Sequence, residues 1–470
     1  MNKITNIIKI ETPQQIMLFF IFVVTMIISL MFYFVHSDLY ALISLIFYYI
    51  ILRWLILRFA EGDDEKKKVL NFFHIALVIR LFWVFISSIW IAFDTTLLIQ
   101  DSLGYDILAK KFIDYIIAGS TDWANDPDAY RAKGFNAYMG FIYLLFNKSA
   151  LTIIIGNAFI SSASASFLYL VGKRTFNENT GKIAAILVII FIPSIIIDAR
   201  VLKAALVFFL VSYMLLLIVE VQRKQSIPIF IELLFILIWL YFTRIYYAFF
   251  FLPALGFIIF SSFPRKKGLF GLAFFVILIS AVIYQEVQTP ASVTLIAMTE
   301  TGWFQVTGNV AIDQSRGAGA LIGLILNPLT ILKSTINGAV FLFLKPIYFY
   351  VQGITLKGDV ALSQSFWNLF STLMWILMPG IVWAFIYCII KLRSQTFFIY
   401  SFLFLAIPFF GLKTMTNRYK IGAYAIIFLL AAVGIDNRKK WLGWAPFYLF
   451  LVMVISIVML EKKLNIFGIF

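Results

Sequence analysis

The chain has 470 residues, of which 62% are hydrophobic and only 13% are charged. Soluble domains are roughly 45–50% apolar, so this composition excludes both a water-soluble core and a disordered chain. Lys and Arg outnumber Asp and Glu by 38 to 23, which gives a formal net charge of +15. In a membrane chain such an excess chiefly sets orientation, so it does not indicate nucleic acid as a partner. We expect an all-α polytopic protein of the lipid bilayer.

Continuous apolar windows bounded by charge predict about 13 transmembrane helices, at roughly 20 residues per span. In chain order they are 16–35, 39–57, 69–93, 150–172, 183–198, 204–221, 226–243, 245–262, 268–285, 367–388, 396–411, 420–435 and 441–460.

The short connections between these windows alternate in charge. Every second one is basic, from Arg58 to Arg438, and placing these in the cytoplasm satisfies the positive-inside rule. Two long polar connections, 94–149 and 286–366, then fall on the extracytoplasmic side, and connections of this length usually have a function. The predicted organisation is a two-span extension (1–68), a core with the first outer loop (69–285), a second outer loop with an interfacial or re-entrant helix (286–366) and a C-terminal bundle (367–470).

The first outer loop opens with Asp101, a few residues beyond the third predicted span. From Tyr105 onward, apolar residues recur every three to four positions, while Asp106 and Lys110 fall on the opposite side, which is typical of an interfacial amphipathic helix. A second helix, 135–146, is too short to span and is also predicted to be interfacial. For Asp101 two interpretations remain open, a helix cap and a general base.

Charged residues gather at the predicted outer ends of spans. Asp198, Arg200 and Lys203 occupy one tight connection, Arg244 lies in another, and Lys413 and Arg418 lie in a third. Cations this close to hydrocarbon are costly unless paired, so we expect a shared anionic ligand such as a phosphate; snorkelling to headgroups is the alternative. Cys388 is the single cysteine and the two histidines lie far apart in the sequence, so a His/Cys metal centre is excluded.

This layout resembles the GT-C superfamily of membrane glycosyltransferases, in particular the branch of protein O-mannosyltransferases and lipid A aminoarabinose transferases. That branch opens its first outer loop with the pattern D-E-x-x-Y-x-x-x-A. Here Asp101, Tyr105 and Ala109 match, whereas Ser102 replaces the second acid. Lys133 stands at the position of a family lysine that precedes an interfacial helix. The resemblance covers residues 69–262 well and 367–436 loosely.

The resemblance implies a GT-C-like catalytic core over 69–285 and transfer of a sugar, with inversion, from a polyprenyl-phosphate donor. The acceptor would be a glycan, lipid or protein, for instance in cell-envelope polysaccharide or lipopolysaccharide, at the outer face of a bacterial cytoplasmic membrane. Asp101 and Asp106 are the expected catalytic residues. The expected substrate-binding residues are Tyr105, Arg131, Lys133, Arg200, Lys203, Arg244, Lys413 and Arg418. No cofactor is assigned; a metal-independent reaction is favoured over a divalent cation bridging Asp101 and Asp198.

Two alternative functions remain open. One is an O-antigen or repeat-unit polymerase that uses a polyprenyl diphosphate-linked oligosaccharide and an outer arginine such as Arg316. The other is a transporter or flippase for lipid-linked sugars. Transporters often contain internal repeats and broken helices at the bilayer midplane. The sequence shows no convincing repeat, and only Arg80 and Glu232 fall well inside predicted spans.

Overall fold

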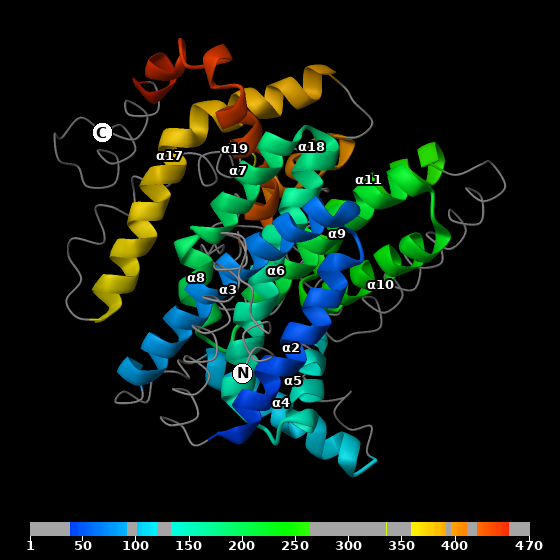
Figure 1. Cartoon of the computed structure of the whole chain (residues 1–470), viewed down its shortest axis with the longest axis vertical. Coiled ribbons are helices and arrows are strands. Elements are labelled where there is room, and N and C mark those ends of the chain that lie inside the picture. Colours follow the sequence, from blue (N-terminus) through cyan, green and yellow to red (C-terminus); the bar gives the residue numbers. More distant parts are fainter. Residues whose placement is uncertain are drawn as a thin grey trace, which may run out of the picture. The chain divides into compact units, whose positions relative to one another are not determined.

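The computed structural model of the chain describes residues 38–91, 101–119, 133–262, 335, 359–391, 396–410 and 421–450. Within these ranges the regular structure is helical and no strand occurs, which confirms the all-α expectation for this part (Figure 1). The predicted spans 16–35 and 268–285 lie outside the described residues, as does nearly all of the second outer loop.

Several helices are suited to crossing a membrane. Four are long and apolar enough: α2 (Leu39–Leu57), α3 (Gly62–Ile91), α6 (Ala150–Thr175) and α9 (Ala204–Lys224). A fifth is obtained if α7 (Glu178–Ile189) and α8 (Ile192–Asp198) form one broken span. The chain is therefore a helical membrane protein, but the predicted count of about 13 spans is not confirmed.

The remaining apolar helices are α10 (Ile227–Thr243), α11 (Ile245–Ser262), α17 (Asp359–Lys391), α18 (Phe397–Phe410) and α19 (Tyr424–Asp436). Over the described residues their apolar segments are too short to meet the length expected of a span.

The predicted span 183–198 is not one continuous helix, because the helix breaks between α7 and α8 and bends by 48°. Pro193 lies in the first turn of α8. Proline has no N–H to donate to the carbonyl four residues earlier, and its ring crowds that carbonyl, so the α7 ladder ends before α8 begins. Asp198 consequently ends a short buried helix instead of a straight span.

The chain forms two compact units, and the first consists of Met1–Leu170 with Ala185–Phe209. In this unit α2 packs on α3, α3 packs on α8, and α4 (Asp101–Ile117) packs on α5 (Lys133–Leu145). The hydroxyls of Tyr48 and Tyr138 lie 3.2 Å apart, and a Cβ at Gly156 would collide with both. Any side chain at Gly156 would therefore have to displace the two tyrosine hydroxyls from α6.

The second unit consists of Val171–Ala184 with Leu210–Phe470. Here α10 packs on α11, α11 on α18, and α17 on α19. The backbones of α17 and α19 approach so closely that a Cβ at Gly434 would lie 2.6 Å from the carbonyl of Gly380. Beyond α19, the basic turn η8 (Arg438–Lys440) follows.

Candidate functional site

The two helices of the first outer loop lie side by side in the first unit (Figure 1). Asp101 is the first residue of α4 and Lys133 is the first residue of α5; the positions of their side chains lie outside the described structure. The ring of Tyr105 on α4 meets the ring of Phe135 on α5 edge to face, with 5.3 Å between centroids. The predicted acid and the predicted lysine thus each begin one helix of a packed pair.

The helical pattern had predicted that Asp106 lies on the solvent side of α4, but in the structure it does not. It is only 3% exposed, because this side of α4 packs against α5. Its Oδ1 accepts a hydrogen bond of 2.5 Å from the Tyr143 hydroxyl, and its Oδ2 accepts one of 2.8 Å from Lys110 Nζ. In this geometry both carboxylate oxygens are engaged, and Asp106 ties the two helices together.

A tightly held connection, residues 199–203, joins α8 to α9. The Arg200 N–H donates to the Ile197 carbonyl at 3.0 Å, and the Arg200 carbonyl accepts from Asn157 Nδ2 at 2.8 Å. At the end of this connection, the Lys203 ammonium lies 5.4 Å from the centroid of the Tyr105 ring, within cation–π range. The contact brings together two segments that the sequence analysis had selected separately.

The Arg200 side chain has no partner among the described residues. No acidic side chain or carbonyl within the described ranges pairs with its guanidinium, although the residue is partly buried. Burial lowers the pKa of Arg200, but arginine stays protonated in proteins. A cation in this setting loses hydration without compensation, so the position favours an anion from outside the protein.

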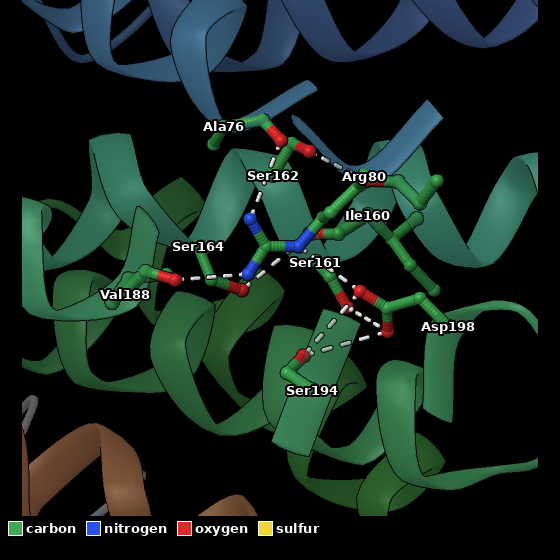
Figure 2. Close-up of polar contacts among 10 residues, drawn as sticks. Ala76, Arg80, Ile160, Ser161, Ser162, Ser164, Val188, Ser194 and Asp198 are labelled. Atoms are coloured by element: carbon green, nitrogen blue, oxygen red, sulfur yellow. Dashed lines mark hydrogen bonds and ion pairs between the residues drawn. The ribbon is translucent and has the colours of Figure 1, made fainter. Parts of the chain in front are cut away.

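A closed ion pair lies in the interior of the same unit (Figure 2). Arg80 of α3 and Asp198 of α8 are both 0% exposed, and Arg80 Nε donates to Asp198 Oδ2 at 3.0 Å. The rest of the guanidinium donates to carbonyls, at 2.9 Å to Val188 and 3.4 Å to Ala76. Every nitrogen of Arg80 therefore has an acceptor.

Two hydroxyls complete the environment of Asp198. Ser161 of α6 donates to Oδ1 at 2.7 Å, and the Ser194 hydroxyl lies 3.4 Å from each carboxylate oxygen (Figure 2). With Arg80 on one side and serines on the other, the Asp198 carboxylate is fully engaged. A divalent cation bridging Asp198 to Asp101, the alternative considered from the sequence, would have to displace these donors.

Sequence reasoning noted Arg80 and Asp198 but missed that they pair. It placed Asp198 at the outer end of a span, next to Arg200 and Lys203. The usable signal was Arg80 itself, in the run LVIRLFW, since a lone cation inside a span requires an acidic partner. Asp198 was a suitable partner for Arg80, because it is an acid at the end of an apolar run in the same half of the chain.

The remaining predicted residues are only partly placed. Arg131, Lys413, Arg418 and Arg316 lie outside the described residues. Arg244 ends α10 in the second unit, where its Nη1 donates to the Tyr246 hydroxyl at 2.9 Å. A single anion site that includes these arginines therefore stays a prediction. In the described part of the chain, no group of three or more His, Cys, Asp or Glu side chains could hold a metal ion.

No model of a known protein family matches the chain, and no curated protein matches it. What the site can do is therefore inferred from its own residues and their chemistry.

Proposed function

We propose that this chain is a GT-C-like glycosyltransferase of the bacterial cytoplasmic membrane. It transfers a sugar from a polyprenyl-phosphate donor to a glycan, lipid or protein acceptor at the extracytoplasmic face. The observation that carries the proposal is the Arg200 guanidinium, which is partly buried, unpaired among the described residues and three positions before Lys203.

The 199–203 connection has the chemistry expected of a phosphate site. Arg200 offers five N–H donors in a planar fork that matches phosphate oxygens. Lys203 adds a compact charge whose position is set by the Tyr105 ring. The backbone of Arg200 is fixed by Asn157 and by its own preceding turn, so little reorganisation is needed when the anion binds.

The proposed reaction is a displacement at the anomeric carbon. The acceptor hydroxyl oxygen forms the new bond while its proton passes to the carboxylate of Asp101, the role that the family resemblance implies for that residue. The bond between the anomeric carbon and the phosphate oxygen breaks, and polyprenyl phosphate leaves with the electron pair. Arg200 and Lys203 stabilise the negative charge that grows on this leaving group.

Removing either cation tests the proposal. Arg200→Met and Lys203→Met should each weaken binding of polyprenyl phosphate to the purified protein by roughly 10- to 150-fold, because each removes a charge-assisted contact. Lys111→Met is the matched control, since Lys111 is an exposed cation of α4 in the same unit. If all three variants bind polyprenyl phosphate as the wild type does, the connection is not a phosphate site.

A flippase or transporter for lipid-linked sugars is the second candidate, favoured by one feature of the structure. The α7–α8 break next to the buried Arg80–Asp198 pair combines a discontinuous span with intramembrane charge, and both are frequent in transporters. Proteoliposomes separate the two functions. A transferase converts donor and acceptor to a glycosylated product, whereas a flippase moves the lipid-linked sugar across the bilayer without breaking its glycosidic bond.

A further inference from the structure

Asn136 is a buried side chain whose hydrogen-bonding capacity is unused. It lies in the first turns of α5 and is only 4% exposed. Among the residues that the structure describes, neither its amide nitrogen nor its amide oxygen has a hydrogen-bond partner. Most buried polar side chains in proteins are paired, and an unpaired one lowers stability, so a carboxamide with both ends open needs an explanation.

The face of α5 that carries Asn136 is directed toward α4. Asn136, Gly140 and Tyr143 follow a spacing of four and three, which places them on one side of the helix. Tyr143 donates to Asp106 on α4, and a Cβ at Gly140 would come within 2.5 Å of the Phe112 ring. Asn136 therefore belongs to the side of α5 that packs against the helix beginning at Asp101.

Asn136 directly follows, in the sequence, a residue whose ring leads toward the proposed phosphate site. Its chain neighbour Phe135 contacts the Tyr105 ring, and that ring in turn holds the Lys203 ammonium at 5.4 Å. Two ring contacts, Phe135 with Tyr105 and Tyr105 with Lys203, thus connect the chain neighbour of Asn136 to the proposed binding site of the anion. All of these residues belong to the first unit.

We propose that Asn136 binds the neutral sugar of the lipid donor, whereas Arg200 and Lys203 bind its phosphate. A carboxamide presents an N–H donor and a carbonyl acceptor side by side, which matches two neighbouring hydroxyls or the acetamido group of a sugar ring. It carries no charge and so adds nothing to phosphate affinity. This assignment rests on the proposed function, but it makes a separate claim about which part of the donor Asn136 recognises.

The competing explanation is an internal water that bridges the Asn136 amide to the protein, which is common at buried polar groups. The two explanations predict opposite changes in the melting temperature when Asn136 is replaced by an apolar residue. If water satisfies the amide, replacing Asn136 by Leu removes useful hydrogen bonds and lowers the melting temperature. If the amide is open until a sugar arrives, the same substitution removes an unpaired polar group and leaves the melting temperature equal or higher.

The experiment measures binding of four probes to the full-length protein in detergent: polyprenyl phosphate, and polyprenyl phosphate carrying glucose, mannose or N-acetylglucosamine. The proteins are wild type, Asn136→Leu, Arg200→Met and the control Thr152→Val. Thr152 is a fully buried side chain of α6 whose hydroxyl already donates to the Ser149 carbonyl at 2.6 Å. Melting temperature is measured without lipid for each protein.

We expect the wild type to bind at least one sugar-bearing lipid more tightly than bare polyprenyl phosphate. Asn136→Leu should lose roughly 5- to 20-fold in affinity for that lipid, keep its affinity for the bare lipid, and melt no lower than the wild type. Arg200→Met should weaken both, and Thr152→Val neither. A wild type that binds all four probes equally, an unchanged preference in Asn136→Leu, or a lower melting temperature with unchanged binding overturns the assignment. Failure of the wild type to bind any probe contradicts the proposed function itself.

Discussion

Each unit of the molecule contains a buried arginine–carboxylate pair, and the two pairs are built differently. In the first unit, Arg80 and Asp198 are both fully buried and come from helices separated by 118 positions in the chain. In the second unit, Arg174 contacts the fully buried Glu220, and its own side chain is 4% exposed. Judged by burial alone, the two pairs would be expected to contribute equally to stability.

Their partners make them unequal. Asp198 has one cation and completes its hydrogen bonds with serine hydroxyls. Glu220 has three cations, because Arg223 and Lys224 of the same helix also contact it, with side chains 37% and 41% exposed. The first pair is thus a single-partner link in a closed interior, whereas the second is a redundant group at helix ends. We expect the number of cations that contact each carboxylate, more than its burial, to decide how much each arginine contributes to the free energy of unfolding.

The largest predicted effect comes from Arg80→Met, which leaves Asp198 buried without a cation. Breaking a buried pair in this way costs on the order of 3–5 kcal/mol. We expect a strongly lowered melting temperature in detergent and a small yield of folded protein. The double variant Arg80→Met/Asp198→Leu is the control, since it removes both charges and should recover most of the loss. A double variant as unstable as the single one would show that the pair is not the cause.

A smaller effect is predicted for Arg174→Met, the same substitution in the second unit. Glu220 keeps Arg223 and Lys224 as partners, so its carboxylate stays paired and the expected loss is roughly 1–2 kcal/mol. Thermal unfolding of the two Arg→Met variants in one detergent compares them directly. Equal losses at Arg80 and Arg174 would contradict the argument from redundancy.

The difference between the pairs also explains what the sequence could and could not predict. Glu220, Arg223 and Lys224 are neighbours on one helix, at spacings of three and four that the sequence displays directly. The Arg80–Asp198 pair depends on how α3, α6 and α8 pack, and no local pattern encodes that packing. Continuous apolar windows predicted most of the described helices well; for example, the window 39–57 coincides with α2.

At the candidate site the same limit applies. Tyr105 was selected because it matches the family motif, and Lys203 because it is a cation at the outer end of a span. Their contact arises from tertiary structure. The pattern of α4 misplaced Asp106, because a helix that packs on another helix buries part of its polar side as well. The bend at Pro193 was visible as a proline within an apolar run, a known signal for a helix break.

The smallest predicted effect sharpens the comparison with a third carboxylate, Asp436, which is held mainly by uncharged donors. At the end of α19 it accepts hydrogen bonds from Asn177, Asn179 and the Thr180 hydroxyl in the second unit. Burial alone would raise its pKa, but these hydrogen bonds and the charge of Arg438 outweigh burial and lower the pKa below its ordinary value of 3.8.

A lowered pKa in the folded state means that the ionised form of Asp436 stabilises the fold. This contribution is complete at pH values above the unfolded-state pKa and is lost as the pH falls through the lowered folded-state pKa. Asp436→Asn should therefore melt a little below the wild type at pH 7, by roughly 0.5–1 kcal/mol because the group is partly exposed, and the gap should close below about pH 4. Asp63→Asn is the control, since Asp63 is an exposed acid paired only with Lys66. A gap that remains at its pH 7 size well below pH 4 would mean that the Asp436 hydrogen bonds act through shape and not through charge. Uncharged donors would then not stabilise a carboxylate here as cations do at Glu220.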